Sequence, residues 1–251
     1  MGDEYKIDRF ADAGEEPNKI LVPIEGYEKK DVLPLNKAVE SIKDLLHNID
    51  AMIYTAVENS NEPSDNLRPD ESAAIHLYTM EWSGSYDSLY SLLNRTLRSE
   101  QRNELKPWFS YLKLLLTALY KLPPLKKIVW RVICGNVSNE YKKKYKIWWG
   151  FSSCTESREV AEKFIRNCDE RTIFKIECIN GRSIESHSYF KDEEEILLMP
   201  GTYLTVLKNW TEAGNIHIIE LQELEPPYQL ITPPFTRQGT GENFNKLLSH
   251  N

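Results

Sequence analysis

The chain has 251 residues, of which 41% are hydrophobic and 27% are charged, and its formal net charge is −7. This balance is ordinary for a globular protein, and the length allows one large domain with a buried core. The negative charge argues against nucleic-acid binding that depends on basic residues, and no apolar run approaches the roughly 20 residues that span a bilayer. We therefore expect neither nucleic acid nor a membrane among the partners.

The first half of the chain reads as a polar lead-in followed by helices. Residues 1–32 are interrupted by Pro17, Pro23 and Gly26, which predicts an extended or poorly ordered segment. A single domain is expected over residues 33–225, helical over 33–124 and β-rich over 125–225. Apolar side chains at helical spacing predict four helices, over residues 35–58, 69–78, 84–97 and 106–122.

The second half of the chain is dominated by β-branched and aromatic runs, which predict strands. The strands are expected over residues 128–134, 147–153, 172–178, 193–198, 203–207 and 216–224. A short helix, capped by Thr155 or Ser157, is expected to continue to Phe164 or Ile165. Helices first and strands afterwards predict an α+β fold.

Other segments of the second half are expected to lie outside regular elements. Residues 142–146 are rich in lysine and adjoin Tyr141, which favours either a solvated connector or a contact with substrate or phosphate. Gly181 is expected to begin a loop. Residues 226–251 are rich in proline and then polar, and we expect a tail that packs loosely or not at all.

Cysteines and histidines give little sign of metal or disulfide chemistry. The chain begins without a basic stretch followed by an apolar one. Its cysteines form no C-x-x-C pair, and they are Cys134, Cys154, Cys168 and Cys178. We therefore expect free thiols and a cytoplasmic location, with secretion possible only if a leader was removed. Five scattered histidines lack metal-ligand spacing, so no metal is expected.

Three features of the strand-rich half point to chemistry. Arg131 lies in an apolar strand, where burying a guanidinium is costly unless a structural carboxylate or a phosphate meets it. The small polar run 153–155 ends an aromatic strand, where it either caps a helix or serves a site. Strand alternation is expected to place Glu193 and Glu195 on one face and Glu194 on the other. Such a pair is either a solvated acidic edge or a functional pair with one raised pKa.

In this order and spacing, the three features resemble the arginine–serine–glutamate class of mono-ADP-ribosyltransferases, the cholera-toxin-like and vertebrate ecto-enzyme branch. The family pattern is an aromatic-Arg, a hydrophobic strand into S-T-S, and E-x-E. It corresponds to Trp130-Arg131, residues 149–155 and residues 193–195. The flanks have counterparts as well, and the likeness covers residues 70–224.

The sequence departs from that pattern in two places. Val132 follows the arginine where the family often has glycine, so the mouth of the pocket is expected to differ. Cys154 and Thr155 occupy the last two positions of S-T-S, whereas Ser153, the position on which the family relies, is kept.

The resemblance implies a mostly helical half packed on a split, two-sheet β core that carries an NAD cleft. It also implies NAD as cosubstrate, loss of nicotinamide, and transfer of ADP-ribose to an arginine-bearing acceptor protein. Glu195 is expected to stabilise the cationic ribose, as carboxylates do in glycoside hydrolysis. Ser153 is expected to hydrogen-bond Glu195, and Glu193 to dock the acceptor guanidinium.

The resemblance further assigns NAD binding to Arg131, at the diphosphate or adjacent ribose, and to Ser153 and the Val132 backbone, which would hold the nicotinamide amide. Tyr189 or Phe190 is expected either to touch the acceptor protein or to pack in the core. Three alternatives remain open: an NAD glycohydrolase on the same fold, an inactive interaction module, and a helical scaffold whose acids are surface charge.

Overall fold

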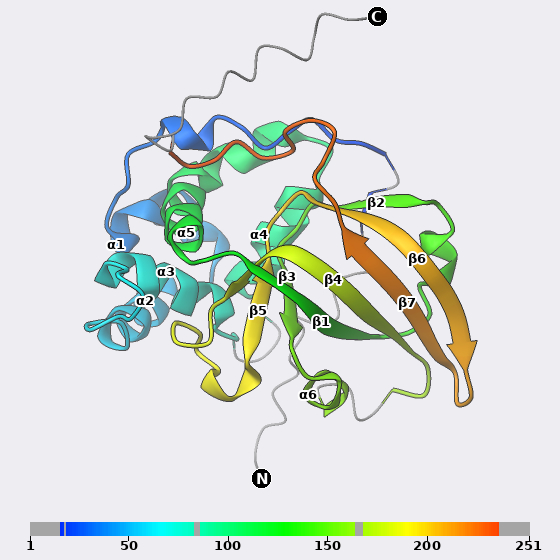
Figure 1. Ribbon diagram of the computed structural model, residues 1–251. Coiled ribbons are helices and arrows are strands. Elements are labelled where there is room, and N and C mark those ends of the chain that lie inside the picture. Colours follow the sequence, from blue (N-terminus) through cyan, green and yellow to red (C-terminus); the bar gives the residue numbers. More distant parts are fainter. Residues whose placement is uncertain (1–15, 18, 83–85, 164–167, 236–251) are drawn as a thin grey trace, which may run out of the picture.

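Helices of the first half and strands of the second half lie side by side in the computed structural model, which describes residues 16–17, 19–82, 86–163 and 168–235 (Figure 1). The helices of the first half gather on one side of the sheet, which confirms the prediction of a mixed helix-and-sheet fold. The α-helices are α1 (Leu35–Ala38), α2 (Ile49–Glu58), α3 (Pro69–Thr79), α4 (Leu89–Arg98), α5 (Phe109–Lys121) and α6 (Arg158–Lys163). None of the helices in the described part of the chain is long and apolar enough to cross a membrane.

Short 3-10 helices connect several of these elements. They are η3 (Tyr27–Lys29), η4 (Glu40–Leu45), η5 (Arg102–Trp108), η6 (Ser138–Tyr141) and η7 (Lys191–Glu193). The long helix expected over residues 35–58 is therefore three pieces, α1, η4 and α2. The break comes where Leu46 is extended and Asn48 has a φ of 53°. Asparagine adopts this left-handed conformation more readily than most residues, and it ends regular helix geometry.

The strands are β1 (Leu125–Cys134), β2 (Tyr145–Trp148), β3 (Ser152–Thr155), β4 (Arg171–Ser183), β5 (Glu195–Leu198), β6 (Thr202–Glu212) and β7 (Ile216–Glu223). The single strand expected over residues 147–153 is thus two strands, β2 and β3, which lie apart in the sheet. Gly181 lies inside β4 instead of beginning a loop. A Cβ at this glycine would stand 2.9 Å from Ile196 Cγ2, so the glycine allows β4 and β5 to approach closely.

The described strands form one hydrogen-bonded sheet in the order β1-β3-β5-β4-β7-β6-β2, with a further pairing of β1 and β4. The four strands β1, β3, β5 and β4 therefore close on themselves as a small barrel. The expected split into two separate sheets is not confirmed. The sequence contains the strands but no signal for the β1–β4 pairing, which joins segments about 40 residues apart through residue pairs such as Arg131 and Phe174.

The described ends of the chain pack together. Ile24 forms a parallel bridge with Ile231, its N–H donates to the Leu230 carbonyl at 2.8 Å, and Thr232 N–H donates to the Ile24 carbonyl at 3.0 Å. Ile24 and Leu230 are buried. The lead-in was expected to be extended or poorly ordered and the tail to pack loosely or not at all. The buried Ile24 and Leu230 show where these two segments pack against the protein.

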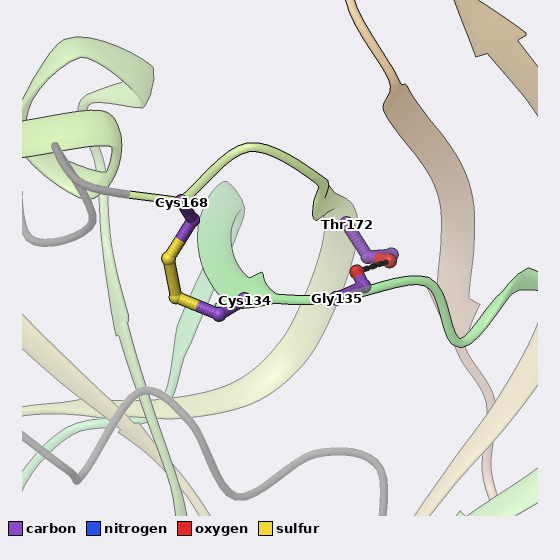
Figure 2. Close-up of a disulfide and its surroundings, with 4 residues drawn as sticks. All are labelled: Cys134, Gly135, Cys168 and Thr172. Atoms are coloured by element: carbon purple, nitrogen blue, oxygen red, sulfur yellow. Dashed lines mark hydrogen bonds between the residues drawn. A yellow bond between two sulfur atoms is a disulfide. The ribbon is translucent and has the colours of Figure 1, made fainter.

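A disulfide joins Cys134, at the end of β1, to Cys168, in the segment that leads into β4 (Figure 2). Their Cα atoms are 5.7 Å apart, which is normal for a disulfide. Next to the bond, the Thr172 hydroxyl donates to the Gly135 carbonyl at 2.7 Å. The expectation of four free thiols is wrong for this pair and holds for Cys154 and Cys178, which are free and buried. Spacing could not reveal the pair because β1 and β4 become neighbours only through the barrel.

Candidate active site

The three features singled out in the sequence lie on adjacent strands of the barrel. Arg131 is on β1, Ser153 on β3 and Glu195 at the first position of β5, and β3 pairs with both of the other strands. All three residues are buried, with exposed fractions of 0%, 2% and 0%. Ser153 lies 22 positions after Arg131, and Glu195 lies 42 positions after Ser153. The sheet thus brings three distant residues into one structural unit.

The register shows which side chains share a face. Thr155 pairs with Glu195, and directly paired residues in antiparallel strands share a face. Because side chains alternate along a strand, Ser153 lies on that face too. Trp130 also pairs with Thr155, so the next residue, Arg131, points to the other face.

Arg131 reaches β3 from that other face. Its Nη1 atom donates a hydrogen bond to the Ser153 carbonyl at 2.8 Å. Arg131 pairs with Phe174 on β4. Burial of the Cys154 thiol raises its pKa to about 12, and the charge of Arg131 opposes this effect. Arg131 therefore ties β1 to the strand that carries Ser153. Binding of the NAD diphosphate by Arg131 stays a prediction.

Val132 is fully buried on β1 and packs with Ala161, Ile173 and Ile218. A valine in place of the family's frequent glycine thus contributes to a small apolar cluster beneath α6. Its backbone role toward nicotinamide stays a prediction, because that role depends on a main-chain group and is independent of the side chain.

The two acids expected to share a face are both buried, whereas the acid between them is exposed. Glu193 is 6% exposed and Glu195 0%, while Glu194 faces solvent. A turn at Glu194 causes this burial pattern. The strand alternation expected for residues 193–195 does not apply, because β5 starts only at Glu195. Glu193 ends η7, Glu194 has a φ of 45°, and β5 begins only at Glu195. This left-handed residue turns the chain so that its neighbours on both sides are buried.

A serine that the sequence did not single out holds the carboxylate of Glu195. The Ser188 hydroxyl, fully buried, donates to Glu195 Oε2 at 3.1 Å and accepts a hydrogen bond from the Phe190 N–H at 3.2 Å. The Ser188 N–H donates to the Ile184 carbonyl at 2.8 Å, which closes the turn that positions the hydroxyl. Sequence analysis did not find Ser188, because a contact across this loop leaves no spacing signal.

If Glu195 stabilises a cationic ribose, as the resemblance implies, replacing Ser188 with alanine is expected to lower kcat about tenfold and to leave the KM for NAD nearly unchanged. A carboxylate that loses its fixed position stabilises the transition state less well. Nicotinamide release at several NAD concentrations measures both constants. Ser186→Ala, at an exposed position of the same loop, is the matched control. Equal kcat values for the two variants would contradict a positioning role for Ser188.

The loop that carries Ser188 is fastened to α3. His187 is buried, with Nδ1 2.9 Å from the Ser72 hydroxyl and Nε2 3.1 Å from Asp65 Oδ2. Burial lowers the pKa of His187, and Asp65 opposes this effect. The Tyr189 N–H donates to the Thr79 hydroxyl at 2.8 Å. These contacts hold the loop at both ends of α3.

The aromatic residues of this loop lie differently. The Tyr189 side chain is 46% exposed and makes an edge contact with the Phe190 ring, their centroids 4.9 Å apart. Phe190 is half-buried. Tyr189 therefore presents a ring to solvent beside the buried acids, as a residue that touches an acceptor would. Contact with an acceptor stays a prediction for both residues.

A buried ion pair holds the chain segment that leads to Ser153. Glu16 accepts a hydrogen bond from Arg98 Nε at 2.7 Å and another from the Trp149 N–H at 2.7 Å. Asn94 Oδ1 accepts from the Phe151 N–H at 2.9 Å. A Cβ at Gly150 would stand 2.8 Å from Arg98 Nη2, so the glycine makes room for this guanidinium. No spacing pattern in the sequence connects Glu16 with residues 98 and 149.

Comparison of the chain with known families gives one match. The family model described as NAD:arginine ADP-ribosyltransferase matches residues 29–226, which is most of the chain. The chain belongs to this family. It is therefore an ADP-ribosyltransferase that uses NAD as its cosubstrate.

Solved structures of bacterial ADP-ribosyltransferases share the fold. Vis from Vibrio splendidus, in complex with agmatine, has 18% identity and a TM-score of 0.53, with 76% of this chain and 92% of that chain covered. Exoenzyme S from Pseudomonas aeruginosa, bound to carba-NAD, has 19% identity and a TM-score of 0.54, with 75% and 88% covered. The Clostridium limosum C3 exoenzyme has 17% identity and a TM-score of 0.52, with 71% and 95% covered. No curated protein matches the chain.

The acids of this ADP-ribosyltransferase are not grouped as metal ligands. Among the described residues, no three or more His, Cys, Asp or Glu side chains lie close enough together to hold a metal ion.

Proposed function

We propose that this ADP-ribosyltransferase transfers ADP-ribose from NAD to the guanidinium of an arginine in an acceptor protein. The observation that supports this most directly is the pair of buried carboxylates, Glu193 and Glu195, on either side of the exposed Glu194. The family's description names arginine, and the related Vis structure holds agmatine, a guanidinium compound.

Glu195 acts on the sugar in this proposal. The bond between nicotinamide nitrogen and ribose C1′ breaks, its electron pair leaves with nicotinamide, and positive charge builds on the ribose. A carboxylate next to that charge stabilises it, and stabilises it more strongly where water is excluded. Glu195 is fully buried, and Ser188 and the register between β3 and β5 fix its position.

Glu193 acts on the acceptor. A guanidinium nitrogen is a weak nucleophile because its lone pair is delocalised over a cation. A carboxylate can bind the guanidinium through two parallel hydrogen bonds, orient one nitrogen toward C1′, and favour loss of its proton as the new C–N bond forms. Glu193 directly precedes the turn into β5, so its carboxylate is two residues from Glu195 on a fixed backbone.

Replacing Glu193 with glutamine is expected to reduce transfer to agmatine at least 100-fold while NAD hydrolysis falls less than threefold, because only the acceptor loses its carboxylate partner. Labelled NAD with and without agmatine measures both products, ADP-ribosyl-agmatine and free ADP-ribose. Glu194→Gln is the matched control, since it removes an exposed carboxylate from the adjacent position.

Two outcomes would count against this assignment. If Glu193→Gln lowers both activities equally, Glu193 serves the sugar and not the acceptor. If the native enzyme yields only free ADP-ribose in the presence of agmatine and of arginine-rich protein, the enzyme is an NAD glycohydrolase and arginine specificity is wrong.

A further inference from the structure

The lysine-rich segment noted in the sequence has no role in the proposed reaction. Lys142, Lys143 and Lys144 are exposed, and none of them forms an ion pair with a residue that the structure describes. Lys144 Nζ lies 5.2 Å from the centre of the Tyr145 ring. A protein with net charge −7 thus carries an uncompensated cationic patch at one place on its surface.

A groove lies directly beside these lysines. Its cavity of about 430 Å³ is lined by residues of and next to strand β2 and by Pro17, Lys19 and Ile20, and we call it the β2 groove. Among its lining residues, we refer to Ile147 and Trp149 as the floor, to Ile20 as the far wall, and to Lys143 and Lys144 as the rim. Ile20 is 67% exposed, so an apolar side chain lies open to solvent where a ligand would cover it.

Two tyrosines extend the floor. Ile147 pairs with Tyr203 on β6, and Tyr145 lies two residues before Ile147, so all three share one face of the sheet. The Tyr145 and Tyr203 rings are stacked, with centroids 5.4 Å apart and planes 15° apart. The groove therefore combines an aromatic and aliphatic surface with a cationic rim.

The charges around the groove leave the rim positive. Lys19 pairs with Glu100 at 2.6 Å, and Lys146, which points to the opposite face from Ile147, has Glu140 Oε2 4.0 Å from its Nζ. Glu16, a described acid on the wall segment, is buried against Arg98. These described acids thus have cationic partners, and none of these pairs involves Lys143 or Lys144.

Strand β2 also offers backbone groups. It is the last strand in the sheet order, so along one side its N–H and C=O groups face away from the sheet. An extended peptide can bind such an edge by adding a strand, with main-chain hydrogen bonds giving affinity and pockets for alternate side chains giving selectivity.

We propose that the β2 groove binds an extended acidic segment of the acceptor protein, with a bulky apolar side chain of that segment on the Ile147–Tyr203 floor and its carboxylates on Lys143 and Lys144. Residues 149–151 connect β2 to β3, which carries Ser153, so a segment docked on β2 lies beside the chain segment that leads to β3. The identity of the docked chain as the acceptor rests on the proposed function.

A peptide is favoured over a nucleic acid for three reasons. The net charge of −7 opposes a polyanion whose binding depends on many phosphate contacts. The lining of the groove includes aliphatic Ile147 and Ile20 beside its aromatic rings. The edge of β2 can pair only with a polypeptide backbone.

Binding is tested by fluorescence anisotropy on the whole chain, with a labelled peptide that has one phenylalanine flanked by acidic residues. Three comparison probes accompany it: the same peptide with lysines for the acids, the same peptide with alanine for phenylalanine, and a labelled single-stranded RNA. We expect the acidic phenylalanine peptide to bind most tightly, and its affinity to fall as salt is raised, since exposed charges are screened.

The double variant Lys143→Glu/Lys144→Glu is expected to weaken binding of that peptide about tenfold or more, because attraction at the rim becomes repulsion. Lys29→Glu/Lys30→Glu, which changes the net charge equally at exposed positions at the end of η3, is the matched control and is expected to bind as the native chain does. Transfer to agmatine is expected to stay unchanged in both double variants, because agmatine lacks the acidic segment that the groove is proposed to bind.

Equal binding by both double variants, tighter binding of the lysine peptide, or tighter binding of the RNA would each overturn the proposal. A drop in agmatine transfer for Lys143→Glu/Lys144→Glu alone would place these lysines at the reaction site and would overturn the separate groove. If the native enzyme does not modify agmatine, the proposed arginine specificity fails, whereas the anisotropy results still decide whether the groove binds acidic peptides.

Discussion

Replacing Glu195 with glutamine is expected to reduce both ADP-ribosyl transfer and NAD hydrolysis by about 1,000-fold. Both reactions pass through the same cationic ribose, and removing one well-placed electrostatic group costs about 100- to 1,000-fold in kcat. The amide of glutamine keeps the size of the side chain and its contact with Ser188, so the fold is expected to survive. Nicotinamide release, measured with and without agmatine, reports both reactions.

The matched control for Glu195→Gln is Glu185→Gln, an equal substitution at an exposed position of the loop before β5. We expect this control to keep native activity, and we expect equal thermal midpoints for the two variants within a few degrees. An active Glu195→Gln enzyme would show that charge stabilisation at the ribose comes from another group, and the assigned roles of Glu193 and Glu195 would then be wrong.

Replacing both Cys134 and Cys168 with serine is expected to lower the free energy of unfolding by about 4 kcal/mol. The disulfide closes a loop between residues 34 positions apart, and the chain-entropy model gives about this value for such a loop. The melting temperature is expected to fall by about 10 °C. Differential scanning calorimetry and denaturant unfolding measure the two quantities.

Reduction of the native chain supplies the control for this variant. A reductant is expected to lower the melting temperature of the native protein by the same amount and to leave the double serine variant unchanged. Thiol titration in denaturant is expected to find two free thiols in the native chain, Cys154 and Cys178. Four free thiols would refute the bond. Disulfides persist mainly in oxidising compartments, and the cytoplasmic location expected from the sequence stays a prediction.

Local patterns predicted the elements of this fold well and their connections less well. The apolar run Ile128–Cys134 lies within β1, and the Pro69-Asp70-Glu71 start of α3 is confirmed. The helix expected over residues 35–58 is wrong in its middle because Asn48 takes a left-handed conformation, which spacing of apolar residues does not register. Gly181 was expected to begin a loop, yet it lies inside β4 and allows close packing there.

The candidate site shows the same division. The residue types and their order brought Arg131, Ser153 and Glu195 together as candidates, and the structure places them on adjacent strands. The direction of Arg131 and the contact of Ser188 with Glu195 depend on register and on a loop that folds back on itself. Such contacts join residues whose separation along the chain follows no helical or strand periodicity, so they could not be predicted from the sequence.

The closed barrel has a consequence for the precision of Glu195. A strand held by one neighbour can slide by a residue, and such a slip would turn every side chain to the opposite side. Strand β5 is hydrogen-bonded to β3 on one side and to β4 on the other, and both of these are bonded to β1. To slide, β5 would have to break two rows of hydrogen bonds at once. The closed ring of strands therefore holds the Glu195 side chain in one position even when nothing is bound.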